Sequence, residues 1–213
     1  MGSNSSANQP GRIIRQERSR KTYNALIETG FKLLETRELE AITISELASQ
    51  AGYSVGAFYA RFHSKDEFFD ALLRRHLEER GEVRARIFAT ETDENLVHAL
   101  MADLVHAYWQ RRRFWRAALI RSVRDPDFWE PARRHGHAFA DAYIARIERQ
   151  AGRQLSEAET LNVRFAFQVA LALINNAIIN RPGPVFLGQD EFVENVARAF
   201  RLVSDSDRLM GLA

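Results

Sequence analysis

Cysteine is absent from the sequence, which excludes disulfide bonds and any metal site built from thiolates. No apolar run approaches the roughly 20 residues that a transmembrane helix requires. The N-terminus, MGSNSSANQPGR, lacks the apolar core of a signal peptide. We therefore expect a cytoplasmic protein that has no membrane partner.

Catalytic motifs are missing as well. The chain has no G-x-S-x-G elbow, no phosphate-binding loop and no H-E-x-x-H helix. His135 and His137 are two residues apart, which on a helix places them about 200° apart and unable to share a metal ion, although in a loop they could. We expect no enzyme, no metal site and no cofactor.

The alternation of apolar and polar residues that is typical of half-buried strands is also missing. Nearly every segment repeats apolar residues at helical spacing, so we expect an all-α fold. With 213 residues and 46% hydrophobic content, the chain can bury one or two compact cores. The net charge is only +2, but a basic arm, which suggests a polyanionic partner or a solvated tail, is formed by Arg12, Arg15, Arg18, Arg20 and Lys21.

The segment from residue 49 to residue 68, SQAGYSVGAFYARFHSKDEF, combines two glycines with five aromatic residues. A first helix is expected from about Ser19 to Arg37, and a short one over Ile44–Gln50, capped by TISE (residues 43–46). Gly52 permits a tight turn, and Ser54 caps a further short helix that ends near Phe62. SKDE (residues 64–67) opens a longer helix that continues to about Ile87. Two short helices joined by a glycine turn are typical of a helix-turn-helix, whose second helix enters the DNA major groove.

The run TISELASQAGYSVGAFYARFHSKDEFFDAL resembles the DNA-binding domain of TetR-type transcriptional regulators. These share the pattern T-x-x-x-[IL]-A-x-x-A-G-[VY]-S-x-G-x-[FIL]-Y-x-x-F-x-x-K-[DE], and the resemblance covers about residues 19–75. Phe58, Phe62 and Phe68 are expected in the core, and Gly56 is expected to let the helix approach a phosphate backbone. One departure is Glu38, which stands where the family usually has glycine, so the first helix either adopts a left-handed residue there or ends differently.

The resemblance implies a set of DNA-contacting residues. Thr43, Tyr59 and Lys65 would hold phosphates, together with His63. The residues implied to face the groove are Ser54, Val55, Gly56, Ala60 and Arg61. Since Val55 and Ala60 offer only apolar contacts, base-specific hydrogen bonds would come mainly from Arg61.

From about residue 92 the expected helices lengthen, over residues 94–110, 111–124, 127–150, 156–180 and 190–204, with a capping box at Ser156 and Glu159. The stretch FAFQVALALINNAII is apolar nearly all round and must be covered on most sides. By the resemblance, the last two long helices pair with those of a second copy in a four-helix bundle. The expected interface residues are Phe165, Leu171, Ile174, Ile178, Phe192, Val196 and Phe200. Periodicity alone equally allows these residues to form the internal core of one chain.

A ligand pocket is expected among the middle helices, where aromatic residues concentrate and polar groups interrupt apolar stretches. The candidate residues are His106, Trp109, Phe114, Trp115, Phe128, Trp129, Phe139, Tyr143, Gln168 and Asn175. For any one of these residues, a place in the core or at an interface remains an alternative. An apolar or aromatic ligand with one or two polar groups fits this composition.

Together these patterns predict an N-terminal three-helix DNA-binding domain and a C-terminal helical domain for ligand binding and dimerisation. The expected boundaries are a disordered tail over residues 1–11, the helix-turn-helix domain over 12–65, a connecting helix over 66–91 and the second domain over 92–213. The expected function is that of a homodimeric regulator, most simply a repressor released from a palindromic double-stranded DNA operator by a small-molecule effector. The alternative is a helical small-molecule-binding or scaffold protein that binds no operator.

Overall fold

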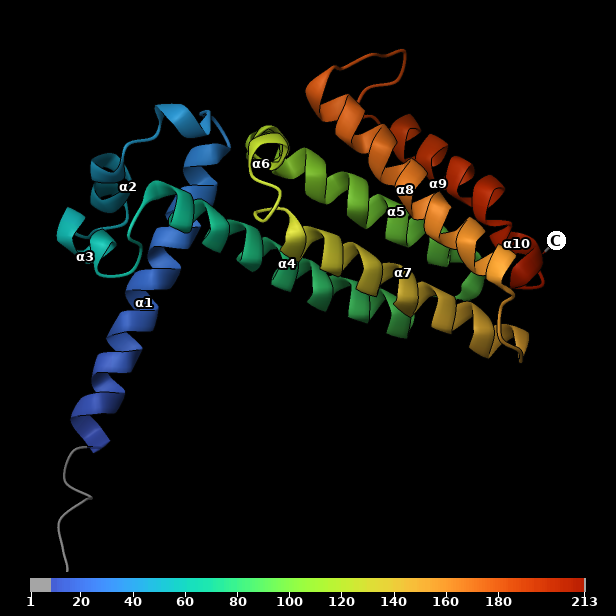
Figure 1. Cartoon of the computed structure of the whole chain (residues 1–213), viewed down its shortest axis with the longest axis horizontal. Helices are drawn as coiled ribbons and strands as arrows, with labels where there is room; N and C mark the ends of the chain where they lie inside the picture. The colour runs from blue at the N-terminus through green and yellow to red at the C-terminus, as the bar shows by residue number, and fades with distance from the viewer. Residues whose placement is uncertain (1–8, 213) are drawn as a thin grey trace, which may run out of the picture. The chain divides into compact units, whose positions relative to one another are not determined.

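The computed structural model of the chain describes residues 9–212, with side chains from Gln16 onward. All regular elements in this range are helices, and no strand occurs among them, which confirms the all-α prediction (Figure 1). In chain order the elements are α1 (Gln9–Leu34), the 3-10 helix η1 (Leu39–Ala41), α2 (Ile44–Gln50), α3 (Val55–Tyr59), α4 (Lys65–Thr90), α5 (Asp93–Gln110), α6 (Arg112–Arg124), α7 (Glu130–Ala151), α8 (Glu157–Ile179), α9 (Asp190–Ser204) and α10 (Ser206–Leu209).

The chain divides into two compact units, Met1–Arg75 and His76–Ala213. The boundary lies inside α4, so this helix contributes its first turns to the first unit and the remainder to the second. Helix α4 is therefore shared by the two units.

The first helix begins and ends differently from the expectation. It starts at Gln9 rather than near Ser19. Pro10 fits this start, because proline lacks a backbone N–H and the N–H groups of the first helical turn have no partner within the helix. The helix ends at Leu34, and Glu38 has an extended backbone with φ −75 and ψ 151. The first helix therefore ends in a different way from that usual in the family, without a left-handed residue at Glu38.

Side-chain caps begin the three helices that follow. The hydroxyl oxygens of Thr43, Ser54 and Ser64 accept hydrogen bonds from the backbone N–H three residues later, at 3.2, 3.2 and 3.1 Å. In a complete capping box, the glutamate side chain also accepts from the backbone N–H of the cap residue. At the starts of α2 and α4 the glutamates bind other groups: the Glu46 carboxylate pairs with Arg37, and the Glu67 carboxylate accepts from the His63 N–H at 2.7 Å. Of the capping boxes expected from the sequence, the one at the start of α8, between Ser156 and Glu159, has both halves.

An aromatic cluster holds the helix-turn-helix together. Phe58, Phe62 and Phe68 are buried, and their ring centroids lie 5.1 to 5.6 Å apart. Tyr23 of α1 adds a fourth ring, 5.4 Å from Phe62. The prediction that the three phenylalanines form the core is confirmed. Helix α3 ends at Tyr59, earlier than expected, although the Phe62 N–H still bonds to the Phe58 carbonyl at 3.0 Å.

Two glycines of the first unit are required for different reasons. Gly52 has φ +79, a left-handed conformation that turns the chain between α2 and α3, and a Cβ there would meet nothing within 4 Å. The expected tight turn at Gly52 is confirmed, and glycine is required there by the backbone conformation. Gly30 is required by packing, because a Cβ there would lie 2.5 Å from Cζ of Phe68.

The second unit is a helical bundle in which α8 packs along α9 and α9 packs on α5 (Figure 1). Phe167 of α8 links three helices, since its ring lies 4.7 Å from Phe139 of α7 and 4.8 Å from Phe200 of α9. The long helices fall close to their expected positions, and α9 has the predicted ends. By length and composition, α8 is the one helix among residues 9–212 that could cross a membrane, and 39% of its most apolar window is buried in the unit.

We predict that Gly30→Ala destabilises the first unit by about 1–3 kcal/mol, because the added methyl group overpacks the buried ring of Phe68. Urea unfolding measures the change. Gly56→Ala is the matched control, since a Cβ there meets only the Ser54 hydroxyl at 3.7 Å. Equal stabilities for the two variants would contradict the packing role of Gly30.

Candidate nucleic-acid interface and cavity

Helix α3 presents a mostly apolar exposed surface. Phe58 points into the core, whereas Val55 is 39% and Tyr59 51% exposed. Gly56 and Ala60 are exposed beside them, and Ser54 caps the helix. No contact inside the unit requires glycine at position 56, because a Cβ there would be in ordinary contact with one hydroxyl. Because these side chains are small, the backbone of α3 can come close to another molecule at this surface.

The basic side chains near α3 are held by partners within the unit. Arg61 donates to the carbonyls of Ser19 at 3.4 Å and Ala60 at 3.0 Å. Lys65 donates to the Leu39 carbonyl at 2.5 Å, and burial lowers the pKa of its ammonium group against the opposing charges of Glu40 and Asp66. These contacts fix where the positive charges lie.

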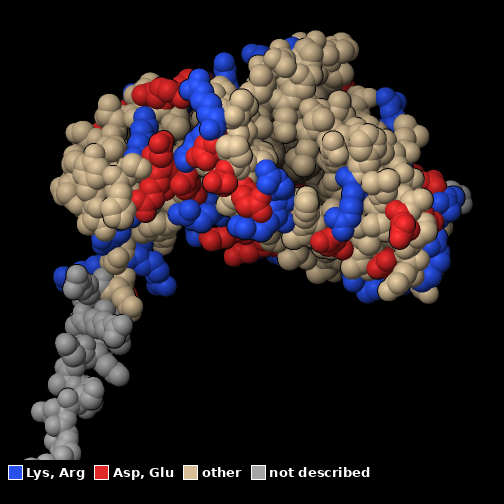
Figure 2. All heavy atoms as spheres, in the orientation of Figure 1, with Lys and Arg blue, Asp and Glu red and all other residues tan. Residues whose placement is uncertain are grey.

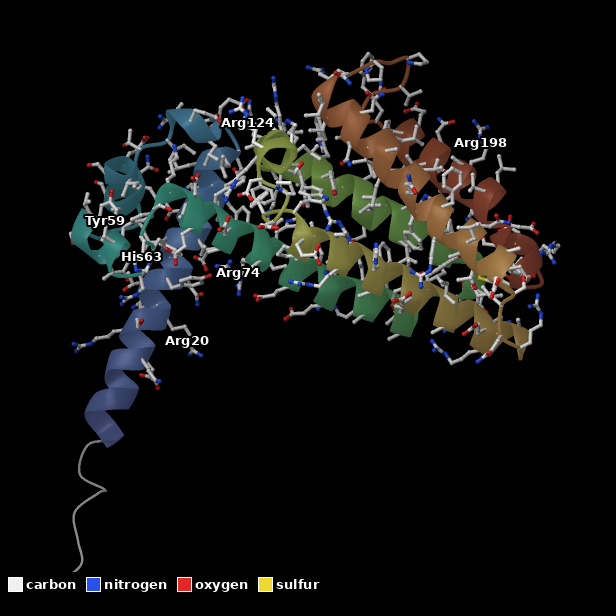
Figure 3. All side chains as sticks on the ribbon, viewed as in Figure 1. Arg20, Tyr59, His63, Arg74, Arg124 and Arg198 are labelled. Atoms are coloured by element: carbon white, nitrogen blue, oxygen red, sulfur yellow. The ribbon has the colours of Figure 1, made fainter. Side chains whose placement is uncertain are left out.

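Further polar side chains are exposed on the first unit. The His63 side chain is 93% exposed and pairs with Glu67 at 2.7 Å. Tyr59 and His63 project from the α3 end, and Arg20 projects from α1 (Figure 3). Thr43 is exposed, and its hydroxyl caps α2. Of the basic arm, Arg18, Arg20 and Lys21 are exposed, whereas the side chains of Arg12 and Arg15 lie outside the described residues.

A cavity of about 580 Å³ lies within the second unit. Its walls come from α4, α5, α7 and α8, which each turn residues three or four apart toward it, and from Trp115 of α6. Aromatic and aliphatic side chains dominate, among them Tyr108, Trp115, Trp129, Phe139 and Phe167. The volume falls in the range of cavities that enclose drug-sized molecules.

One end of the cavity is cationic. His76, Arg80 and Arg84 follow each other at spacings of four on α4 and line it together. Asp103 of α5 accepts from Arg80 at 2.7 Å, and its second oxygen lies 3.6 Å from Nε of Arg84. The Arg84 guanidinium also contacts Nε2 of His135 at 2.5 Å and lies 4.2 Å from the ring centroid of Phe139.

The histidines at this end are neutral at pH 7. Burial, reinforced by the positive charges of Arg111, Arg80 and Arg84, lowers the pKa of His76 to about 2. Burial and Arg84 lower the pKa of His135 to about 4. Neutral imidazoles can accept hydrogen bonds from arginine, which agrees with the 2.8 Å contact between NH1 of Arg111 and Nδ1 of His76.

Several buried polar atoms of the cavity lack a hydrogen-bond partner among the described residues. They are Nε of Arg84, Nε1 of Trp115 and Oδ1 of Asn175. A buried polar atom without a partner costs about 1–3 kcal/mol, so the hydrogen bonds of this cavity wall are incomplete among the described residues.

The sequence profile of a family described as "Bacterial regulatory proteins, tetR family" matches residues 26–72. This range contains α2, the glycine turn and α3, the elements that present the exposed surface described above. Residues 26–72 therefore form a TetR-type DNA-binding segment, and the resemblance stated from the sequence is confirmed.

Similarity extends to other regulators. The HTH-type transcriptional regulator YwcC of Bacillus subtilis (strain 168) is 29% identical over 102 residues, an alignment that spans 44% of this chain and 45% of that protein. Among solved structures, a TetR-family regulator from Streptomyces coelicolor has a TM-score of 0.63 at 19% identity, over 91% of this chain and 82% of its own. A TetR regulator from Rhodococcus sp. RHA1 has a TM-score of 0.55 at 20% identity, over 88% of this chain and 97% of its own. At these identities the structures show that the fold is shared.

The cavity of this TetR-family chain brings together half of the residues expected from the sequence. Trp115, Trp129, Phe139, Gln168 and Asn175 line it. His106 and Trp109 are instead exposed, with Trp109 beside Gly188 and under the Arg112 guanidinium at 4.4 Å. The remaining three, Phe114, Phe128 and Tyr143, are buried in the core outside the cavity. The pocket assignment for these five is corrected, because aromatic residues also fill helix contacts.

The expected interface residues also separate. Ile174, Ile178, Phe192, Val196 and Phe200 are each at most 9% exposed within a single chain. The assignment of these five to a dimer interface is corrected, because helices of their own chain already cover them. Phe165 is 51% exposed and Leu171 is half-buried, and both line the cavity.

The cationic residues of the cavity were missed in the sequence. His76, Arg80 and Arg84 lie in the segment assigned to a connecting helix, whereas the pocket was expected where aromatic residues concentrate. Their spacing of four was a usable signal, because it places three polar side chains on one face of a helix. His135 and His137 both line the cavity, and no group of three potential metal-binding side chains occurs among the described residues.

We predict that acidification from about pH 6.5 to pH 5 lowers the free energy of unfolding. The unfolded chain binds a proton at His76 near its ordinary pKa of about 6.5, whereas the folded chain, with a pKa of about 2, does not, so stability is lost as the pH falls. The expected loss is about 1.4 kcal/mol per pH unit for each such histidine. Urea unfolding of His76→Gln should give a shallower slope, whereas His106→Gln, at an exposed position, should keep the parent slope. Parallel slopes for parent and His76→Gln would refute this.

Proposed function

We propose that this TetR-family regulator is a homodimeric, cytoplasmic repressor that is released from a palindromic operator by a small apolar or aromatic effector. The observation that carries the proposal is the coexistence of an exposed α3 surface in one unit and a cavity of about 580 Å³ in the other. Operator release by a cavity ligand tests it. No catalytic activity is part of this proposal.

DNA contact is assigned to the exposed residues of the helix-turn-helix. Tyr59 and Thr43 supply hydroxyl groups for phosphates, and Lys65 and His63 supply positive charge. Ser54, Val55, Gly56 and Ala60 face the groove, where the small side chains allow close approach. Arg61 reads a base edge only if it leaves the carbonyls of Ser19 and Ala60, so specificity depends on that exchange.

Dimerisation is assigned to an exposed face of α8. Leu161, Phe165, Ala172 and Ile179 fall within about 40° of one another on a helix of 3.6 residues per turn, and all four are exposed. Figure 2 shows that the surface over this helix is largely uncharged. Leu202, which is 78% exposed on α9, extends the apolar surface beyond α8, whereas Arg198 of α9 projects away from the helix (Figure 3). A face of this kind favours a second apolar surface over water.

Helix α4 provides the physical route between effector and DNA. Its first residue, Lys65, belongs to the helix-turn-helix unit, and His76, Arg80 and Arg84 of the same helix line the cavity. In a dimer bound to DNA, the two α3 helices must lie about 34–36 Å apart to enter successive major grooves. A ligand that favours another position of α4 lowers the population of dimers with this spacing. Ligand and operator are then reciprocally coupled.

The rival function is a helical ligand-binding or scaffold protein that binds no operator. It is favoured by the sparse polar surface of α3 and by the engagement of Arg61 and Lys65 within their own unit. Binding sites selected from random DNA, followed by measurement of salt dependence, distinguish the two.

We predict that Tyr59→Phe weakens binding to operator and to non-specific DNA alike, by about 1 kcal/mol, because a phosphate contact carries no sequence information. Fluorescence anisotropy with the selected site and a scrambled site measures both affinities. Tyr53→Phe, in the turn, is the matched control. If folded Tyr59→Phe binds both DNAs like the parent, α3 is a packing element and the regulator proposal fails for this surface. Lys65→Ala is a less direct test, because it also removes the bond to Leu39.

We predict that Phe165→Asp and Ile179→Asp raise the dissociation constant of the dimer by about 10-fold or more, because each places a charge in the apolar face of α8. Sedimentation velocity over a micromolar dilution series measures the change. The control is Val123→Asp, which introduces the same charge at an 83% exposed apolar residue of α6. A parent protein that is monomeric throughout, or α8 variants that dimerise like the control, would refute this interface.

A further inference from the structure

The cationic end of the cavity carries more positive than negative charge. Arg80 and Arg84 share a single carboxylate, that of Asp103, at 2.7 and 3.6 Å. The side chains of Arg84 and Asp103 are only 9% and 8% exposed, so water screens this cluster weakly. Two guanidiniums and one carboxylate leave an excess of one positive charge.

The surrounding charged groups do not supply the missing negative charge. Arg111 pairs with Glu79 at 2.8 Å, Arg164 with Asp141 at 2.6 Å and Arg133 with Glu130. His76 and His135 are neutral, because burial and the arginines lower the pKa of each. The excess charge therefore persists among the described residues, and a buried unpaired charge is costly.

Hydrogen-bond donors at this end also lack acceptors. Nε1 of Trp115 is buried without a hydrogen-bond partner among the described residues, and Nε of Arg84 lies 3.6 Å from Oδ2 of Asp103, beyond hydrogen-bond distance. The Trp115 ring lies 5.0 Å from His76 and stacks at 4.1 Å on Tyr108, and all three side chains line the cavity together with Arg84. Trp115 is 2% exposed and lines the cavity.

We propose that the cavity binds an aromatic monocarboxylate, whose carboxylate accepts from Arg84 and Trp115 and whose rings pack against Trp129, Phe139 and Phe167. This inference rests on the proposed function of the cavity as the effector site and specifies the class of effector. A planar guanidinium matches a carboxylate in both charge and geometry. One negative charge equals the excess, whereas a phosphate dianion would exceed it.

The test compares acids with their neutral amides. We measure 2-naphthoic acid against 2-naphthamide, and biphenyl-4-carboxylic acid against its amide, by titration calorimetry at pH 7.5. Each pair has one shape and differs in charge, so the acid should bind the parent protein about 10-fold or more tightly. Equal affinities within the pairs, tighter binding of the amides, or no binding of either acid would overturn the inference.

Variants locate the contact. Arg84→Met should abolish the preference, so that each acid binds like its amide, since the methionine keeps an apolar stem but carries no charge. Arg84→Lys should restore part of the preference, because the charge returns without the planar fork. Arg116→Met, at an exposed position of α6 outside the cavity, should keep the full preference. A folded Arg84→Met that retains the preference overturns the assignment, and if this variant fails to fold, the Arg84→Lys result decides in its place.

Release of operator DNA separates this inference from the proposed function. An acid that binds through Arg84 but leaves the operator complex intact supports the binding site and refutes its role as an effector site. An amide that binds as tightly as its acid and releases the operator supports the effector role and refutes the preference for carboxylates.

Discussion

A helix of five residues has almost no stability of its own in water, so α3 depends on the aromatic cluster beneath it. Phe58 anchors α3 from within, while Phe62 and Phe68 hold the segment that follows. Because Phe58 fixes one face, Val55, Tyr59 and Ala60 are left on the other. The same cluster explains Gly30, which makes room in α1 for the ring of Phe68. The exposed surface of α3, which we propose contacts DNA, thus results from the packing of its opposite face.

The second unit is organised around charge as well as apolar contacts. Its bundle is held by aromatic contacts such as Phe139 to Phe167, yet the buried Arg84 and the partly exposed Arg80, which line the cavity, share the carboxylate of Asp103. Replacing such a cluster by apolar residues is often neutral or stabilising, so stability alone gives little reason for it. Because Arg80 and Arg84 line the cavity, the charge of this cluster can interact with a bound molecule.

Most of the fold could be predicted from the sequence because helical periodicity and capping residues are local signals. Thr43, Ser54 and Ser156 each cap the helix that their position predicted. The spacing of His76, Arg80 and Arg84 was a local signal for one face of α4, but the contacts with Asp103 and His135 could not be predicted, because they depend on α4, α5 and α7 meeting. The interface assignment failed at Phe200 for a related reason. Periodicity identifies the apolar face of α9, but it does not tell whether a neighbouring helix or a partner covers that face.

Helix α8 contributes to two surfaces that are usually considered separately. Leu161, Phe165 and Ala172 line the cavity and also belong to the exposed apolar face. A partner that covers this face therefore borders the ligand, and the two binding equilibria share atoms. Occupancy by the small molecule would then vary with the concentration of the protein itself, by mass action. A dilute sample and a crowded cell would report different affinities for the same compound.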